Sequence, residues 1–281
     1  NYVKVDLSLN QATVYDSLNA ATTDIDSYVS IENIVGSKNN DTFIMNATDN
    51  VANTINGGIA GIDTISYERY TTKVTVNLGA TDGINTVKSG DIDTILNIEN
   101  LIGGNAGDEL TGSDGDNTII GGDGSDTFIG SKGEDVIIGG IVLTTDADGK
   151  ILTQTDNYID TIDYSYLTTD KGIEVDMNMA GENDSVLNKG KVKEDGHGNS
   201  DILYGIERII GSQYADQITG DTDDNVDNTF EGKAGEDIIS GGSGNDSLFG
   251  GADDDTLEGG SGNDSLSGES GNDQFKTTSY D

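Results

Sequence analysis

Residues 232–276 read GKAGEDIIS GGSGNDSLF GGADDDTLE GGSGNDSLS GESGNDQFK, five consecutive units of nine residues. Each unit has glycine in its first half and an aspartate at its sixth position, and a large apolar residue follows two places later. A fixed period of this kind is typical of a solenoid, in which each unit stacks only on its neighbours. Glycine permits the sharp turn, and the remainder is long enough only for a short strand. The sixth-position aspartates are Asp237, Asp246, Asp255, Asp264 and Asp273.

A second block with the same period covers residues 103–138 and reads GGNAGDELT GSDGDNTII GGDGSDTFI GSKGEDVII. Its sixth positions are Asp108, Asn117, Asp126 and Asp135, and a large apolar residue again follows each of them two places later. One carboxylate beside one glycine turn would mean little. Two registered blocks of such units predict a structural repeat.

Units of this form resemble the RTX family, also called haemolysin-type calcium-binding repeats, whose pattern is GGxGxDxUx with U a large apolar residue. The resemblance implies an all-β fold: an elongated, right-handed parallel β-roll or β-solenoid, with calcium held between the glycine-rich turns of adjacent coils. It implies that sixth-position carboxylates and glycine-loop carbonyls bind several Ca²⁺ ions. Carried over to this sequence, the carboxylates are those of Asp41, Asp108, Asp126, Asp135, Asp216, Asp237, Asp246, Asp255, Asp264 and Asp273. The carbonyls are those of Gly121, Gly124, Gly241, Gly244, Gly250, Gly259 and Gly262.

The composition agrees with bound calcium. The chain has 52 acidic and 14 basic residues and a net charge of −38, which opposes a compact state without ions. Calcium takes about six to eight oxygen ligands, whereas softer metals would find no cysteine and a single histidine here. A solvated or disordered acidic surface is the alternative, but the acids fall in phase with glycines and apolar residues. We therefore expect blocks that are largely unfolded without calcium and form a β-rich roll with it.

Longer units repeat across the rest of the chain. Residues 3–9, 74–80 and 173–179 (VKVDLSL, VTVNLGA and IEVDMNM) alternate apolar and polar residues, as half-buried strands do. After each of these strands comes an aspartate that stands five residues before an isoleucine. A second aspartate follows at the sixth position of a nonapeptide, and an asparagine stands nine residues after that second aspartate. These are, in turn, Asp26, Asp93 and Asp201; Asp41, Asp108 and Asp216; and Asn50, Asn117 and Asn225.

These long units predict how the chain is organised. The first, partial unit covers residues 1–66, and the second covers 67–158 with the roll block 103–140. The third covers 159–281 with the roll block 232–276. We expect one continuous elongated array rather than separate compact domains.

Some segments depart from the strict repeat. Insertions at 141–157 and 180–200 should project from the roll, the first as a hairpin because Asp148-Gly149 lies between apolar runs. The recurring asparagine should take a left-handed turn or act as a weak ligand. Asp63 lies in a motif with one extra residue, so its ligand role is less secure. No helical periodicity of useful length and no apolar run long enough to span a bilayer is present.

Catalytic motifs are scarce. The sequence has neither HExxH nor GxSxG, and a Ser-His-Asp arrangement would depend on His197, which we expect to be a surface residue. A pair of glycosidase-type acids stays open on composition alone. The negative field disfavours nucleic acid as a partner. The tyrosines, among them Tyr67, Tyr70, Tyr164 and Tyr166, should pack rather than form a sugar-binding platform. We therefore expect no catalytic residues and no enzyme activity.

The resemblance also implies a location and a function. RTX proteins are exported by Gram-negative type I secretion, so a secreted, extracellular or cell-surface protein is implied. Calcium is scarce inside the cell and abundant outside, which would delay folding until export. Three functions are open: a structural segment of an S-layer protein or adhesin, the folding and secretion part of an exported enzyme or toxin, or a β-solenoid enzyme. Calcium is the expected partner, and further copies of the chain or cell-surface glycans are open alternatives.

Overall fold

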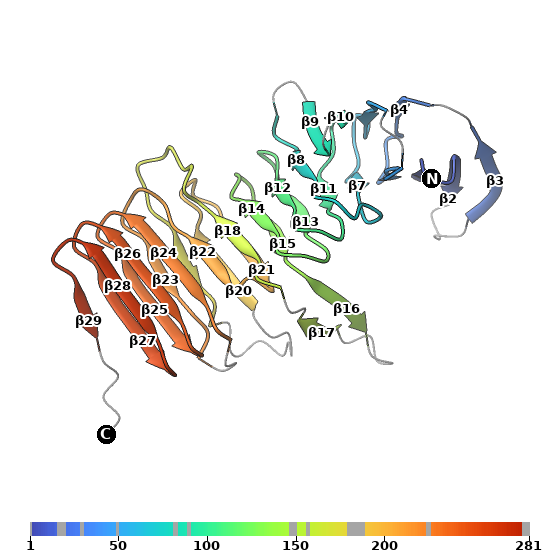
Figure 1. Cartoon of the computed structure of the whole chain (residues 1–281). Helices are drawn as coiled ribbons and strands as arrows, with labels where there is room; N and C mark the ends of the chain where they lie inside the picture. Colours follow the sequence, from blue (N-terminus) through green and yellow to red (C-terminus); the bar gives the residue numbers. More distant parts are fainter. Residues whose placement is uncertain are drawn as a thin grey trace.

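The structure is a computed structural model that describes residues 2–15, 21–28, 31–48, 51–80, 84–88, 91–145, 151–155, 158–178, 189–222 and 226–276. All regular structure in these residues is β-strand, so the described part holds no helix that could cross a membrane. Most strands stack side by side into one long array (Figure 1). The all-β, parallel solenoid fold predicted from the repeats is confirmed.

Two large sheets run along the array. The first has 15 strands: β1 (Tyr2–Asp6), β2 (Gln11–Tyr15), β3 (Ala21–Ser27), β5 (Thr42–Ile44), β7 (Thr64–Ser66), β11 (Asn100–Ile102), β13 (Thr118–Ile120), β15 (Val136–Ile138), β19 (Glu174–Asp176), β20 (Lys189–Glu194), β21 (Asp201–Tyr204), β23 (Gln217–Thr219), β25 (Ile238–Ser243), β27 (Thr256–Ser261) and β29 (Gln274–Lys276). The second has eight strands: β8 (Thr75–Asn77), β12 (Glu109–Thr111), β14 (Thr127–Ile129), β18 (Thr161–Asp163), β22 (Arg208–Ile210), β24 (Thr229–Ala234), β26 (Ser247–Ala252) and β28 (Ser265–Ser270).

Two smaller sheets complete the fold. One has four strands, in the order β4 (Asn33–Val35), β6 (Thr54–Asn56), β10 (Asp91–Leu96) and β9 (Ile84–Lys88). The other is the antiparallel hairpin of β16 (Ile141–Thr145) and β17 (Ile151–Thr155). The predicted hairpin in the first insertion is therefore confirmed, while its Asp148-Gly149 turn lies outside the described residues.

One coil of the roll consists of two nonapeptides. Consecutive units alternate between the two large sheets, so β24, β26 and β28 lie in one sheet and β25, β27 and β29 in the other. Within a sheet the neighbours are parallel, and Phe230 pairs with Leu248, which pairs with Leu266. Side chains at equivalent positions of successive coils therefore stack in ladders along the array.

The core is a narrow band between the two sheets. The eighth-position residues Leu110, Ile119, Phe128, Ile137, Ile239, Leu248 and Leu257 are all buried in it. Three of the four tyrosines named from the sequence, Tyr67, Tyr70 and Tyr164, are also buried there, as predicted, whereas Tyr166 is exposed. One large apolar side chain per unit leaves little area to bury, so cohesion must come from other contacts as well.

The described part of the second insertion, residues 189–200, does not project as predicted. It contains β20, which pairs antiparallel with β19 on one side and with β21 on the other. Val192 of β20 is fully buried in the core. The sequence KGKVKE of this strand alternates buried and less buried residues, so it completes the large sheet instead of leaving it.

Candidate calcium-binding turns

Each coil is joined to the next by an aspartate at the glycine-rich turn. The main-chain N–H of Asp237 donates to Oδ1 of Asp255, eighteen residues on, at 2.9 Å. The N–H of Thr256 donates back to the carbonyl of Asp237 at 2.8 Å. The carboxylate thus takes the place of a main-chain acceptor just outside the sheet, where the strand pairing ends. We call such side chains inter-coil carboxylates.

All ten aspartates predicted from the repeats are inter-coil carboxylates. Each accepts a hydrogen bond of 2.6–3.1 Å from a main-chain N–H of the neighbouring coil. They are Asp41, Asp108, Asp126, Asp135, Asp216, Asp237, Asp246, Asp255, Asp264 and Asp273. The role of each as a calcium ligand stays a prediction.

Six further acids have the same role, and sequence reasoning did not assign it to them. They cap N–H groups between coils at 2.7–3.0 Å, and they are Asp63, Asp93, Asp160, Asp201, Glu99 and Glu207. Each stands two places before a buried apolar residue, as Glu99 does before Leu101. The pattern acid-x-apolar, without the glycines, would have found them.

Asn117 occupies the same position with an amide. Its N–H donates to Oδ1 of Asp135 at 2.9 Å, and its own Oδ1 accepts the N–H of Ser113 at 2.6 Å. Its Nδ2 donates to the carbonyl of Glu99 at 2.7 Å. It does not have positive φ, so the left-handed turn, one of the two roles predicted for it, is wrong, and Asn117 serves the coil-to-coil contact. Its role as a weak ligand stays a prediction. Asn50 and Asn225 lie outside the described residues.

The second carboxylate oxygen distinguishes two groups among the inter-coil carboxylates. In the first group this oxygen accepts a main-chain N–H of its own loop, from Ser37 to Asp41, Gly104 to Asp108 and Ser212 to Asp216. In the second group, Oδ2 of Asp237, Asp246 and Asp255 is buried and accepts no hydrogen bond from any residue that the structure describes. A buried oxygen without a donor is costly unless a cation binds it.

The first glycine of each unit makes room for these oxygens. A Cβ atom on Gly232 would collide with Oδ2 of Asp237 and lie 2.6 Å from the carbonyl oxygen of Gly250, one coil on. A Cβ on Gly241 would meet Oδ2 of Asp246 and the carbonyl oxygen of Gly259 in the same way. Carboxylate and carbonyl oxygens of two coils therefore converge at the turn. This donor set fits calcium, which prefers such oxygens at about 2.3–2.6 Å.

The other predicted glycines lie in the same turns. The carbonyl oxygens of Gly121, Gly241 and Gly244 face the glycines of the adjacent coil, at Gly103, Gly220 and Gly262. Gly124 has a φ of 114° and Gly262 a φ of 138°, which favour glycine. Within the described part of the chain, no three His, Cys, Asp or Glu side chains gather as a metal site by themselves. Main-chain oxygens would have to complete the coordination.

Electrostatics in the second group favour a cation. Burial, assisted by the charges of Asp216, Asp255 and Asp253, raises the pKa of Asp237 to about 8. Burial likewise raises the pKa of Asp246 to about 6. Each shift is the cost of holding a negative charge in a turn that has no counter-charge. A divalent ion would remove that cost.

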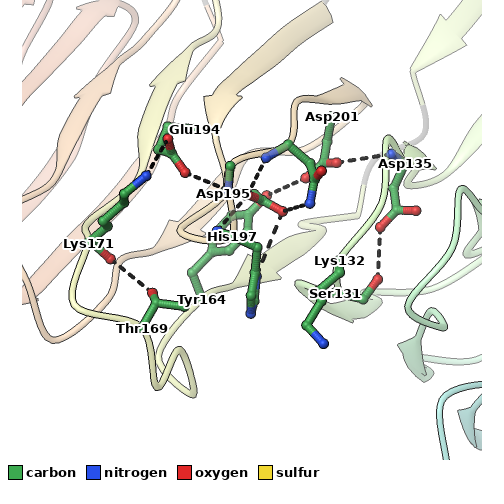
Figure 2. Close-up of polar contacts among 12 residues, drawn as sticks. Ser131, Lys132, Asp135, Tyr164, Thr169, Lys171, Glu194, Asp195, His197 and Asp201 are labelled. Atoms are coloured by element: carbon green, nitrogen blue, oxygen red, sulfur yellow. Dashed lines mark hydrogen bonds and ion pairs between the residues drawn. The ribbon is translucent and has the colours of Figure 1, made fainter.

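Two of the inter-coil carboxylates, Asp135 and Asp201, lie with Asp195 near Tyr164, whose hydroxyl donates to Oδ2 of Asp201 at 3.4 Å (Figure 2). Burial, with the charges of Asp135 and Asp195, raises the pKa of Asp201 to about 7. Asp195 is fully buried and accepts the N–H groups of His197 and Asn199 at 2.8 and 2.9 Å. His197 is thus held in a tight turn and is partly buried, where we had expected a surface histidine.

A family comparison bears on these turns. The family model of the RTX calcium-binding nonapeptide repeat matches residues 102–140, 201–226, 224–257 and 249–276. The chain carries RTX calcium-binding repeats. RTX repeats bind multiple Ca²⁺ ions, so calcium is a partner of this chain. Nine of the ten predicted aspartates lie in the matched segments, and Asp41 lies outside them. No curated protein matches the chain.

Proposed function

We propose that this chain is a calcium-folded structural module of a secreted bacterial cell-surface protein, of the S-layer or adhesin kind. It folds and stiffens on meeting extracellular calcium, and it mediates calcium-dependent association of copies. The observation that supports this proposal most is the buried Oδ2 atom of Asp237, Asp246 and Asp255, which has no hydrogen-bond partner among the residues that the structure describes. Glycine carbonyls of the next coil lie beside these turns. The ions bind between coils at these turns and supply the cohesion that the narrow core lacks.

A structural role suits the distribution of the acids. Inter-coil carboxylates run from Asp41 in the first long unit to Asp273 in the last, so nearly every coil is tied to its neighbour in the same way. A turn whose ion is surrounded by protein oxygens leaves no open position for a substrate. The proposed module therefore has no catalytic residues of its own. Export and localisation at the cell surface belong to this proposal through the RTX repeats.

The alternative is a folding and secretion module of an exported enzyme or toxin. It uses the same calcium chemistry, and it differs in what the parent protein does beyond the repeats. The three-fold reuse of the long unit favours the structural role, because each added unit lengthens the stack. A parent chain with a catalytic domain would favour the alternative.

A calcium titration followed by far-ultraviolet circular dichroism tests the proposal. Starting from calcium-free buffer, we expect little β signal and then a cooperative rise as calcium is added. Magnesium at the same concentration is the control, because it demands a tighter octahedral site and gives up its water reluctantly. Full β structure in the presence of a chelator would refute calcium-driven folding.

A further inference from the structure

The residue at the second position of a nonapeptide takes one of two backbone conformations. In the turns of Asp237, Asp246 and Asp255 this residue has a positive φ, and we call these the open turns. The three second-position residues are Lys233 (φ 83°), Gly242 (φ 97°) and Gly251 (φ 116°). A left-handed φ is unfavourable for lysine, so the fold and not local preference sets this conformation. In each open turn, Oδ2 of the aspartate is buried and has no hydrogen-bond partner among the residues that the structure describes.

Three turns with serine at the second position take the other conformation. The φ of the serine is not positive in any of them, and its N–H points into the turn. This N–H donates to a side-chain oxygen of the sixth residue, for example from Ser212 to Oδ2 of Asp216 at 2.6 Å. We call these the serine-closed turns, and their paired residues are Ser37 and Asp41, Ser113 and Asn117, and Ser212 and Asp216. Ser131, also at a second position, is not counted among them, because it donates to Asp135 through its hydroxyl, at 2.8 Å.

The serine hydroxyl fixes the closed conformation. Oγ of Ser212 donates to Oδ1 of Asp216 at 2.7 Å and accepts the N–H of Tyr214 at 3.0 Å. The hydroxyls of Ser37 and Ser113 make the same two kinds of contact, at 3.1–3.3 Å. Ser212 is fully buried, so water does not compete for these bonds. Such local bonds from serine to the main chain hold a turn in one conformation.

The oxygens around the two kinds of turn are otherwise alike. In the turn of Asp216, a Cβ on Gly211 would meet Oδ2 of the aspartate and lie 2.6 Å from the carbonyl oxygen of Gly232, one coil on. In the open turn of Asp237, a Cβ on Gly232 would lie at the same distance from the carbonyl oxygen of Gly250. The donated N–H is therefore the difference between the two turns. An N–H carries a partial positive charge, so it repels a cation that approaches the same oxygen.

Asn117 shows that a serine-closed turn does not need a charge. A neutral amide stands there in the place of the carboxylate and accepts the same N–H, although charged ligands set calcium affinity. We propose that the serine-closed turns bind no calcium, because the serine N–H occupies the place of the ion, and that calcium binds at the open turns. Asp41, Asn117 and Asp216 are then structural residues of their turns and not the ligands that we predicted. This deepens the proposed function and rests on it, since it says which turns of a calcium-binding chain take the ion.

Asp216→Asn and Asp237→Asn are a matched pair of variants, because the N–H of Asp216 donates to Oδ1 of Asp237 and the two turns lie in adjacent coils. Equilibrium dialysis with radioactive calcium at a saturating concentration counts the ions bound per chain. Circular dichroism on the same samples checks the fold. We expect Asp237→Asn to bind fewer ions than the wild type, and Asp216→Asn to bind the same number. Equal counts for the two variants, whether both lower or both unchanged, would overturn the proposal.

Changing the serine tests the proposal from the opposite direction. Ser212→Gly combined with Tyr214→Gly gives this turn glycines at the second and fourth positions, where Gly242 and Gly244 have positive φ. Ser212→Ala is the control, because it removes the hydroxyl but alanine disfavours positive φ, so the N–H should stay on Oδ2 of Asp216.

We expect the glycine variant to bind more ions than the wild type. The alanine variant should bind the same number as the wild type and unfold at a lower urea concentration, because it has lost the hydroxyl bonds. A glycine variant that gains no ion, or an alanine variant that gains one, would overturn the role of the serine. A wild type that binds no calcium overturns the proposed function itself.

Discussion

The main-chain N–H of Asn228 donates to Oδ1 of Asp246 at 2.9 Å, while Oδ2 of Asp246 is buried and has no donor in the described part of the chain. One oxygen of this side chain therefore holds two coils together, and we propose that the other binds a calcium ion. The two functions can be separated by changing the carboxylate to an amide, which keeps the first oxygen and replaces the second.

Asp246→Asn should weaken the response to calcium and leave the ion-free roll no less stable. The amide retains an acceptor for the Asn228 N–H and removes a buried negative charge, whose pKa burial has raised to about 6. We expect the calcium concentration at the folding midpoint to rise about threefold to tenfold, since ligand charge sets affinity at such sites. Circular dichroism titration measures it.

Asp108→Asn is the matched control for that variant. Both oxygens of Asp108 already accept main-chain N–H groups, from Val74 at 2.8 Å and Gly104 at 2.6 Å. The amide leaves one donor without an acceptor, at a cost of about 1–3 kcal/mol with or without calcium. A change of the calcium midpoint as large as that of Asp246→Asn would contradict the division into two groups.

Gly232→Ala should damage the turn through sterics alone. The added methyl would collide with Oδ2 of Asp237 and crowd the carbonyl oxygen of Gly250, both in the proposed calcium-binding turn. We expect a loss of about 1–3 kcal/mol from overpacking, together with a higher calcium midpoint. Gly115→Ala is the control, because its methyl would lie 3.9 Å from Oγ of Ser113, an ordinary contact. Equal unfolding midpoints in urea for the two variants would contradict the crowded turn.

Acid should stabilise the ion-free roll. The folded state raises the pKa of Asp237 to about 8 and of Asp246 to about 6, from an ordinary value of 3.8. The folded form therefore binds protons more tightly than the unfolded form. The stabilisation is complete below about pH 4 and is lost as pH rises through about 6 and then about 8. Calcium affinity should move the opposite way, because the ion competes with these protons.

Circular dichroism of the calcium-free protein between about pH 5.5 and 8.5 checks this dependence, and the range stays above the isoelectric point of about 4.1. We expect the β signal to fall as pH rises. General charge repulsion also grows with pH. Asp237→Asn distinguishes the two causes, since it should flatten the part of the curve between about pH 7 and 8.5. A β signal that increases with pH would refute the raised pKa values.

Much of this architecture follows from the nonapeptide rule. Leu248 and Leu257 stand where the eighth position predicts, because a file of apolar side chains must face the interior of every coil. The nonapeptide rule did not find the inter-coil acids that are not sixth-position aspartates. Glu99 and Glu207 replace aspartate, and their units lack the flanking glycines that drew attention to the others. The place of β20 within the large sheet depends on its two neighbours, which local sequence does not encode.

The division of the carboxylates into two groups was also beyond the sequence. Asp216 and Asp237 both follow a glycine by five residues, yet only the loop of Asp216 turns an N–H, that of Ser212, toward Oδ2. That difference arises from the path of each loop over the adjacent coil. In the loop of Asp237, Gly235 lies against the main chain of Tyr214 and Ala215 in the adjacent coil, a contact that local sequence does not reveal.

The N-terminal hairpin of β1 and β2 should depend on a partly buried ion pair between Asp6 and Arg69. Nη1 and Nη2 of Arg69 donate to Oδ1 and Oδ2 of Asp6 at 2.7 and 2.8 Å, which joins the end of β1 to the loop after β7. Burial raises the pKa of Asp6, but hydrogen bonds from Arg69 and Ser8 outweigh it, so that the pKa is lowered. A bidentate, partly buried pair of this kind is stronger than a single-contact pair on the surface.

A double-mutant cycle of Asp6→Ala and Arg69→Ala in saturating calcium measures the coupling by urea unfolding. We expect about 1–3 kcal/mol, because the charge left by either single change loses its hydrogen-bonding partner. The pair of Lys132 and Asp114 is the control, with side chains 51% and 82% exposed at 2.9 Å, and should give about 0–1 kcal/mol. Equal coupling in the two cycles would mean that Arg69 does not anchor the hairpin. Faster hydrogen exchange in β1 of Arg69→Ala would show directly that the hairpin has loosened from the roll.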